Sequence, residues 1–215
     1  MGKAVVVLSG GQDSTTCLFW ALETFEEVHA VIFDYGQRNI EEVETARKIA
    51  DHKGVISKVI KLDFEGFTPN AMTDTAMEIE DGEVPNTFVP GRNQVFLTYA
   101  SMYARAIGSH HVIIGVSQAD YSGYPDCTNE FIKSFGRTIS IAMDYPVYIL
   151  TPLMYLDKSQ VWDLADKLGG PELVDFIKKN TVSCYNGIKG NGCAECPSCK
   201  LRNRGYNEYL RGTRQ

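Results

Sequence analysis

Five short runs of apolar and β-branched residues recur along the chain, at 4–8, 28–33, 55–62, 111–116 and 147–150. These runs are apolar almost throughout, which is typical of strands that are buried on both faces. Segments of helical period separate them. Strands that alternate with helices in this way predict a parallel sheet covered on both sides.

The intervening segments show the spacing of amphipathic helices. After Gly11, one helical face collects Cys17, Leu18, Ala21, Leu22 and Phe25. A second helix places its apolar face at Ile40, Val43, Ala46 and Ala50. A third is expected at 94–107, and Lys158 opens a later one. The fold class is therefore α/β, a doubly wound five-stranded parallel sheet in which ligands bind at the carboxyl ends of the strands.

Two segments break this rhythm. Residues 63–93 form a connection that is unusually long and rich in Thr, Asp, Glu and Pro, so we expect a loop that covers a site. Residues 180–200 hold four clustered cysteines. We therefore divide the chain into a catalytic domain at 1–180 and a cysteine-containing segment with the tail at 181–215.

Composition narrows the class of protein. The 215 residues are 44% hydrophobic, enough for one substantial core. The formal net charge of -6 argues against a protein that binds a polyanionic backbone, so no nucleic acid partner is expected. The sequence shows no long apolar run and no signal pattern, so we expect a cytoplasmic protein without membrane contact.

The first strand runs directly into Ser9-Gly10-Gly11-Gln12-Asp13-Ser14, which we term the phosphate turn. Adjacent glycines let the backbone turn sharply and approach a ligand, and the N–H groups at the following helix start attract anions. Ser9, Ser14 and Thr15 add hydroxyl donors. An ordinary helix start is the alternative, because Ser, Asp and Gly are common there.

The phosphate turn lacks the Gly-Lys-Ser/Thr ending of the P-loop. Ser-Gly-Gly-x-Asp-Ser instead resembles the signature of the PP-loop ATP pyrophosphatases, which have a Rossmann-like, adenine nucleotide alpha hydrolase-like fold. The resemblance implies that ATP is attacked at its α-phosphorus and that Asp13 helps to hold Mg²⁺. The residues it implies for nucleotide binding are Leu8, Ser9, Gly10, Gly11, Gln12, Asp13, Ser14, Thr15, Phe33, Asp34, Tyr35 and Gly115.

Two basic residues are candidates for catalysis beside Asp13. Arg92 lies at the start of the third helix, where its planar donor fork can reach a phosphate or a carboxylate. Lys158 resembles the late lysine that faces pyrophosphate in PP-loop enzymes. The alternatives are a plain helix start around Arg92, a solvated Lys158 and, at Asp34, a solvated carboxylate that ends a strand.

The four clustered cysteines have metal-ligand spacing. Cys184, Cys193, Cys196 and Cys199 follow a C-x8-C-x2-C-x2-C pattern among glycines. Four thiolates suit tetrahedral Zn²⁺ and leave no position for water, so a structural zinc knuckle with one ion per chain is expected. An iron-sulfur cluster uses the same ligands, and unrelated free thiols are a third reading.

The combination of motifs narrows the resemblance. The chain carries Ser-Gly-Gly-Gln-Asp-Ser-Thr-Thr-Cys at 9–17, Asp-Tyr-Ser-Gly-Tyr-Pro-Asp-Cys at 120–127 and the four-cysteine knuckle. Over nearly its full length it resembles the 7-cyano-7-deazaguanine synthase family. This implies that Tyr121 or Tyr124 stacks on a deazaguanine, that Asp126 accepts from its edge and that Cys127 adjoins the substrate. An ordinary turn with Cys127 as a small buried residue is the alternative.

The resemblance implies a ligase of queuosine biosynthesis, a homodimer, with 7-carboxy-7-deazaguanine, ammonia and ATP as substrates. ATP would activate first the carboxylate and then the resulting amide, releasing AMP and pyrophosphate each time and leaving the nitrile. Two rivals stay open. One is a tRNA-modifying PP-loop enzyme, which the acidic balance disfavours; the other is a zinc-knuckle binding module with a vestigial nucleotide site, which the intact phosphate turn disfavours.

Overall fold

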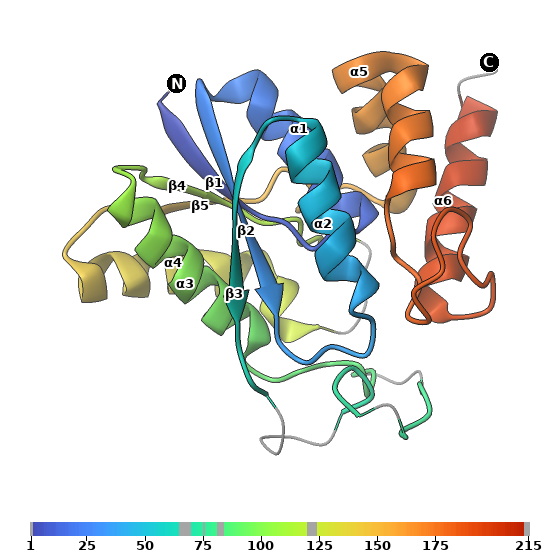
Figure 1. Cartoon of the computed structure of the whole chain (residues 1–215), viewed down its shortest axis with the longest axis horizontal. Coiled ribbons are helices and arrows are strands. Elements are labelled where there is room, and N and C mark those ends of the chain that lie inside the picture. The colour runs from blue at the N-terminus through green and yellow to red at the C-terminus, as the bar shows by residue number, and fades with distance from the viewer. Residues whose placement is uncertain (1, 65–69, 75, 81–83, 120–123, 213–215) are drawn as a thin grey trace.

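The computed structural model describes residues 2–64, 70–74, 76–80, 84–119 and 124–212. Within them one parallel sheet has the strand order β3-β2-β1-β4-β5 (Figure 1). Its strands are β1 (Lys3–Val7), β2 (Glu27–Asp34), β3 (Ile56–Lys61), β4 (His111–Ile113) and β5 (Tyr148–Leu150). The doubly wound, five-stranded architecture expected from the sequence is confirmed.

Neighbouring residues of the central strands supply two separate cores. Ala4, Val6 and Leu8 point to the side covered by α1 (Gln12–Thr24) and α2 (Glu41–His52). Val5 and Val7 point to the side covered by α3 (Arg92–Ala106) and α4 (Asn129–Met143). Both faces of β1 are therefore dry, which explains why its sequence is apolar without alternation.

The fourth strand is shorter than the apolar run predicts. Pairing in β4 ends at Ile113, although the Ile114 N–H still donates to the Leu150 carbonyl at 3.1 Å. Ile114 and Val116 lie beyond the strand and are nonetheless buried, at 5% and 6% exposure. Their apolar character reflects burial against the α3 side of the sheet rather than strand pairing.

The amphipathic helices also match the pattern, with one error. Cys17, Leu18 and Ala21 are buried on α1 as expected. Ile40 is 55% exposed, because it precedes the first turn of α2 and does not belong to its buried face. None of the helices in the described part of the chain combines the length and the apolar character that a membrane span requires.

The last two helices pack together outside the sheet (Figure 1). They are α5 (Lys158–Asn180), which is kinked at Gly169 and Gly170, and α6 (Pro197–Gly212). Trp162 and Ile177 of α5 share a core with Tyr209 of α6. The boundary at residue 180 stays a prediction, and α6 completes its hydrophobic contacts on α5.

The connections of the sheet reverse direction beside β1. The chain moves outward from β1 through β2 to β3, and then returns to add β4 and β5 on the other side. The connections that leave the carboxyl ends of β1 and β4 consequently run to opposite faces of the sheet, α1 to one and α4 to the other, which leaves a crevice of the kind that holds ligands in doubly wound folds. The phosphate turn follows β1 directly into this crevice.

Gly10 is the residue that fixes the path of the phosphate turn. Its φ is +83°, and a Cβ at this position would lie 2.6 Å from the Glu42 carbonyl oxygen and 2.9 Å from the Ala46 nitrogen. We expect Gly10→Ala to lower the free energy of unfolding by about 2–4 kcal/mol, because backbone strain and a collision with α2 combine. Urea unfolding measures this.

Gly54→Ala is the matched control for Gly10→Ala. Gly54 also has a positive φ, +66°, but a Cβ there meets nothing within 4 Å. It should lose only the backbone contribution, about 1 kcal/mol. Equal losses in the two variants would contradict close packing between the phosphate turn and α2.

Candidate active site

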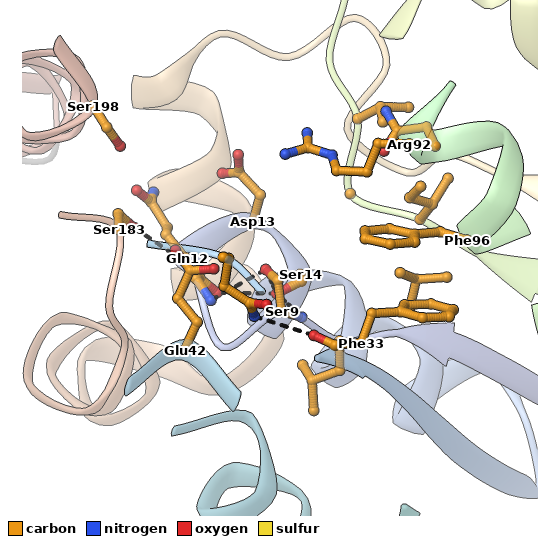
Figure 2. Close-up of a pocket in the computed structure, with 18 of the residues that line it drawn as sticks. Ser9, Gln12, Asp13, Ser14, Phe33, Glu42, Arg92, Phe96, Ser183 and Ser198 are labelled. Atoms are coloured by element: carbon orange, nitrogen blue, oxygen red, sulfur yellow. Dashed lines mark hydrogen bonds between the residues drawn. The ribbon is translucent and has the colours of Figure 1, made fainter. Parts of the chain in front are cut away.

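A cavity of about 320 Å³ opens at the carboxyl ends of β1, β2 and β4 (Figure 2). This volume lies within the range of about 300–1,000 Å³ that is usual for small-molecule sites. Its lining includes the sequence-predicted Leu8, Ser9, Gly11, Gln12, Asp13, Ser14, Phe33, Tyr35, Arg92, Gly115, Tyr124, Cys127 and Lys158. Gly10, Thr15, Asp34 and Asp126 are outside the lining, and Tyr121 falls outside the described residues.

The phosphate turn is held by its own serines. Ser14 Oγ accepts a hydrogen bond from the Ser9 N–H at 3.2 Å and lies 3.0 Å from Ser9 Oγ. The Gly11 N–H donates to Ser9 Oγ at 3.4 Å. The loop therefore keeps one shape through local bonds, so its ligand-facing groups are placed before a ligand arrives.

Gly115 brings the end of β4 against the same turn. A Cβ on Gly115 would lie 3.0 Å from the Asp13 carbonyl carbon and 3.1 Å from the Ser14 nitrogen. A side chain there would displace the first turn of α1. The role of Gly115 is thus close approach, while Gly10 serves the same purpose on the α2 side.

Gln12 has unused hydrogen-bonding capacity at the start of α1. The residue is 2% exposed, lines the cavity, and neither its Oε1 nor its Nε2 has a partner among the described residues. Buried amides normally make such bonds, since an unmade bond costs about 1–3 kcal/mol. A polar ligand in the cavity would satisfy both atoms.

Asp13 and Lys158 meet although 145 positions separate them. Lys158 Nζ donates to Asp13 Oδ2 at 2.7 Å, with side-chain exposures of 14% and 30%. Asp13 Oδ1 is buried and has no partner among the described residues. A carboxylate with one oxygen paired and one oxygen available is suited to bind a hard cation while a lysine stays beside it.

Arg92 faces Asp13 across the cavity (Figure 2). Its Nη1 donates to Tyr35 Oη at 3.3 Å, and its Nε lacks a partner among the described residues. Burial acts to lower the pKa of Arg92, but Tyr35 and Asp126 outweigh burial and raise the pKa above its usual range. The guanidinium therefore remains charged and has a donor to offer to an anionic group.

Aromatic rings form the wall beside Arg92 (Figure 2). Phe33 and Phe96 stack with centroids 4.1 Å apart and planes 1° from parallel, and Tyr35 adjoins Phe96 at 5.3 Å. Such a flat apolar wall suits a planar heterocycle. Asp34 ends β2 next to this wall, half-buried, and its main-chain carbonyl accepts from Leu62 at 2.7 Å.

The described part of the 120–127 segment contributes a polar edge to the cavity. Tyr124 Oη lies 2.5 Å from Thr87 Oγ1, which joins this segment to the long 63–93 connection. The Cys127 thiol donates to Asp126 Oδ1 at 3.8 Å, and burial followed by Asp126 raises the pKa of Cys127 to about 12. Cys127 is therefore a neutral thiol near pH 7 rather than a nucleophilic thiolate.

Asp126 lies just behind the lining. It is 7% exposed, its Oδ2 has no partner among the described residues, and burial raises its pKa although Arg92 acts to lower it. Asn93 holds the segment by donating to the Asp126 carbonyl at 3.4 Å and to Cys127 Sγ at 3.7 Å. The geometry leaves a carboxyl group one layer from the cavity.

Sequence reasoning missed polar and aromatic residues that line the cavity. Ser183, Tyr185 and Ser198 could have been found, because they flank the cysteine ligands, whereas Glu42 lies on a helix whose charged residues look solvated. Gln37 braces the turn after β2 by bonding the Tyr35 N–H at 2.8 Å and the Phe33 carbonyl at 3.1 Å. The missed set is Gln37, Glu42, Thr87, Asn93, Phe96, Ser117, Ser183, Tyr185 and Ser198.

The four clustered cysteines converge as their spacing predicts. The sulfur atoms of Cys184, Cys193, Cys196 and Cys199 all lie within 4.8 Å of one another. The Asn186 N–H donates to Cys184 Sγ at 3.4 Å, and the Cys196 N–H to Cys193 Sγ at 3.3 Å, bonds that suit charged sulfur. The cluster can thus hold a metal ion such as zinc.

The cysteine knuckle is attached to the cavity on one side. Asn39 Nδ2 donates to the Cys184 carbonyl at 3.3 Å, and Gly187 packs against the Asn39 side chain. Ser183 Oγ accepts from the Gln12 N–H of the phosphate turn at 3.4 Å. The metal-binding segment and the phosphate turn are therefore direct neighbours.

Comparison with known proteins agrees with this geometry. The structure of NMN synthetase from Francisella tularensis superposes with a TM-score of 0.51 at 16% identity, covering 97% of this chain and 86% of that one, which shows a shared fold. The parallel sheet and its first turn define an α/β protein of the PP-loop ATP pyrophosphatase class. The chain belongs to the family described as queuosine biosynthesis protein QueC, whose model matches residues 3–210.

A relative named 7-cyano-7-deazaguanine synthase, from Bacillus subtilis (strain 168), is 54% identical over 211 residues. The match covers 97% of this chain and 95% of that protein. The family resemblance deduced from the three sequence motifs is thereby confirmed over almost the whole length.

Glu42 predicts a pH-dependent stability. Burial raises its pKa from 4.5 to about 7, although Arg92 acts to lower it. A raised folded-state pKa stabilises the fold below pH 4.5, and this contribution is lost as the pH rises through 7. Because Gln stays neutral, the free energy of unfolding of Glu42→Gln should exceed that of wild type by about 1 kcal/mol at pH 5, rising to about 3 kcal/mol at pH 8.

Urea unfolding at several pH values measures the Glu42 effect, with Glu44→Gln as the control for removing a charge from the same helix. A difference between wild type and Glu42→Gln that stays constant with pH would show that Glu42 ionises as readily in the folded chain as in the unfolded one.

The cysteine cluster predicts a stability that depends on metal. A strong chelator should release the ion, expose four further reactive thiols and lower Tm by roughly 5–10 °C, since each kcal/mol is worth about 2–4 °C at this chain length. Elemental analysis, thiol titration and calorimetry measure the three quantities. Cys193→Ser should lose the metal and Cys127→Ser should keep it; a purified chain that is free of metal yet melts unchanged contradicts the assignment.

Proposed function

We propose that the chain is a 7-cyano-7-deazaguanine synthase that converts 7-carboxy-7-deazaguanine and ammonia to the nitrile at the expense of ATP. The observation that carries the proposal is the phosphate turn, which lies at the switch point of the sheet and opens into a cavity with unpartnered polar groups. The 54% identity to a protein of that name over nearly the full chain supports the same activity.

The polar side of the cavity is the proposed site of the triphosphate. The N–H groups at the start of α1 face it together with the hydroxyls of Ser9 and Ser14, so negative charge is favoured there. Asp13 Oδ1 is the proposed ligand of Mg²⁺, which when bound would neutralise phosphate charge. Lys158 is kept at the same point by its 2.7 Å ion pair with Asp13 and stabilises the leaving pyrophosphate.

The aromatic side of the cavity is the proposed site of the planar rings. Phe33, Tyr35 and Phe96 offer flat faces to such rings. The Asp126 carboxyl lies one layer behind the lining, so it would accept from the donor edge of a purine-like base only after a local shift of its segment. Arg92 stands between the aromatic and polar sides with a charged guanidinium. It is positioned to bind the carboxylate of the substrate and to direct its oxygen toward the α-phosphorus.

The proposed reaction repeats one kind of activation. The substrate carboxylate attacks the α-phosphorus, pyrophosphate leaves, and ammonia displaces AMP from the acyl adenylate to give an amide. The amide oxygen then attacks the α-phosphorus of a second ATP and pyrophosphate leaves again; loss of AMP and of both protons from the amide nitrogen leaves the nitrile. Carboxylate and amide have almost the same size, so Arg92 and the phosphate turn can serve both rounds without rearrangement.

The remaining assignments are part of the same proposal. Residues 1–180 form the catalytic domain, and 181–215 form a zinc knuckle with one structural Zn²⁺ per chain. The enzyme acts as a cytoplasmic homodimer on small molecules without nucleic acid. Four thiolates support a structural role for the ion, because they leave no open coordination position.

One assay tests the activity and its closest rival together. The protein is incubated with ATP, Mg²⁺, ammonia and 7-carboxy-7-deazaguanine, and AMP and the nitrile are quantified by mass spectrometry. We expect two AMP for each nitrile formed. AMP release that requires tRNA would identify a tRNA-modifying enzyme instead, and absence of AMP would leave the metal knuckle as the functional part.

Asp13→Asn tests the proposed cation ligand. The amide keeps the size of the side chain but loses its charge, so AMP release should fall by about 100-fold or more while Tm stays close to that of wild type. Asp51→Asn, on the exposed side of α2, is the control and should retain activity. Full activity in Asp13→Asn would remove this residue from the reaction.

A further inference from the structure

The chain segment that leads into the cysteine knuckle runs beside the phosphate turn. The Val182 N–H donates to the Gly10 carbonyl at 3.0 Å, and the Gln12 N–H donates to Ser183 Oγ at 3.4 Å. These are contacts between the first turn of the fold and residues more than 170 positions later. Ser183 itself lines the cavity and points toward Gln12 (Figure 2).

The Ser183 hydroxyl accepts hydrogen bonds but donates none within the described residues. Its oxygen accepts two hydrogen bonds, from the Gln12 N–H at 3.4 Å and from Arg202 Nη1 at 3.1 Å. Both bonds use lone pairs, so the hydroxyl hydrogen is directed elsewhere, and the described residues supply no acceptor for it. An acceptor atom in the cavity would take this hydrogen.

Arg202 lies behind Ser183 with a buried charge. It is 4% exposed, its Nη2 donates to the Ile177 and Lys178 carbonyls at 3.2 and 3.1 Å, and its guanidinium lies 5.5 Å from the Trp162 ring. Within the described residues it forms no ion pair. Asp13 and the Cys199 thiol are near enough to act on this charge, but the hydrogen bonds that Arg202 makes to described residues all go to neutral groups. A buried charge bonded in this way favours a further anion nearby, since burial with little compensation is costly.

We propose that Ser183 is a further phosphate-binding residue, whose hydroxyl donates to a phosphate oxygen of the nucleotide while Arg202 orients it and supplies positive charge from behind. The proposal rests on the proposed function, because it requires ATP in this cavity. It gives the cysteine knuckle a second effect: Ser183 precedes one cysteine ligand and Arg202 follows another by one helical turn, so a metal ion bound by the cysteines would hold both in place.

Calorimetry tests the proposal by measuring two affinities in the presence of Mg²⁺, that for ATP and that for pyrophosphate, which competes with ATP for the same site. Ser183→Ala should weaken the binding of ATP and of pyrophosphate about 10- to 100-fold, the range for a hydrogen bond to a charged group. Adenosine, which has no phosphate, should bind wild type and Ser183→Ala equally. Ser183→Thr keeps the hydroxyl and should restore most of the affinity, with metal content unchanged in both variants.

Ser109→Ala is the matched control. Ser109 Oγ also accepts from a backbone N–H, that of His111 at 3.1 Å, but it lies at the opposite edge of the sheet and outside the cavity lining. It should lose stability and keep its affinity for ATP. Arg202→Lys should weaken ATP binding as well. Because Arg202 acts through Ser183, the loss of ATP affinity in the double variant Ser183→Ala/Arg202→Lys should be smaller than the product of the losses in the two single variants.

The outcomes separate the two proposals. Wild type that fails to bind ATP at all overturns the proposed function and this inference with it. Wild type that binds ATP, together with Ser183→Ala of equal affinity, overturns only the role of Ser183. An equal loss for adenosine and ATP also overturns it, because the residue would then shape the cavity as a whole instead of contacting phosphate.

Discussion

Close packing around the phosphate turn is the constraint on which the site depends. The missing side chain of Gly10 lets the α2 backbone pack against the turn on one side, and that of Gly115 lets the end of β4 pack against it on another. On a third side the Val182 N–H donates to the Gly10 carbonyl. A loop enclosed in this way keeps its N–H groups in one arrangement. Such preorganisation is what allows fixed dipoles to stabilise charge without reorganising during the reaction.

The fold and the phosphate turn were accessible to sequence reasoning because both depend on local signals. Unbroken apolar runs indicate strands that are buried on both faces, and Ser-Gly-Gly-x-Asp-Ser indicates a sharp turn between a strand and a helix. The prediction was wrong for Ile40, because helical spacing in the sequence does not show at which residue a helix begins. It was also wrong for the end of the fourth apolar run, because an apolar residue can be buried without pairing in a strand. The structure puts Ile40 outside α2 and Ile114 outside β4.

The site was accessible only in part. Residue type and motif make Asp13, Arg92 and Lys158 candidates, and the structure adds that all three line one cavity and that Asp13 and Lys158 form an ion pair. Glu42 could not be deduced, because its presence in the cavity follows from packing between segments that are remote in sequence. Ser183 and Tyr185 also come from a remote segment, but their position beside the cysteine ligands was a signal that could have identified them. Asp126 illustrates the converse, since the motif makes it a candidate while its carboxyl group lies one layer behind the cavity lining, and its role stays a prediction.

The contact between Ser183 and the start of α1 spans 171 positions, and this separation affects how the protein is made. During synthesis the first turn leaves the ribosome long before its late neighbour exists, so the sheet can begin to fold around an incomplete pocket. Contacts of such long range close slowly, because chain entropy must be lost before they form. The lining of the cavity is consequently complete only once α6, which carries Arg202, has packed against α5 and Ser183 lies beside the start of α1.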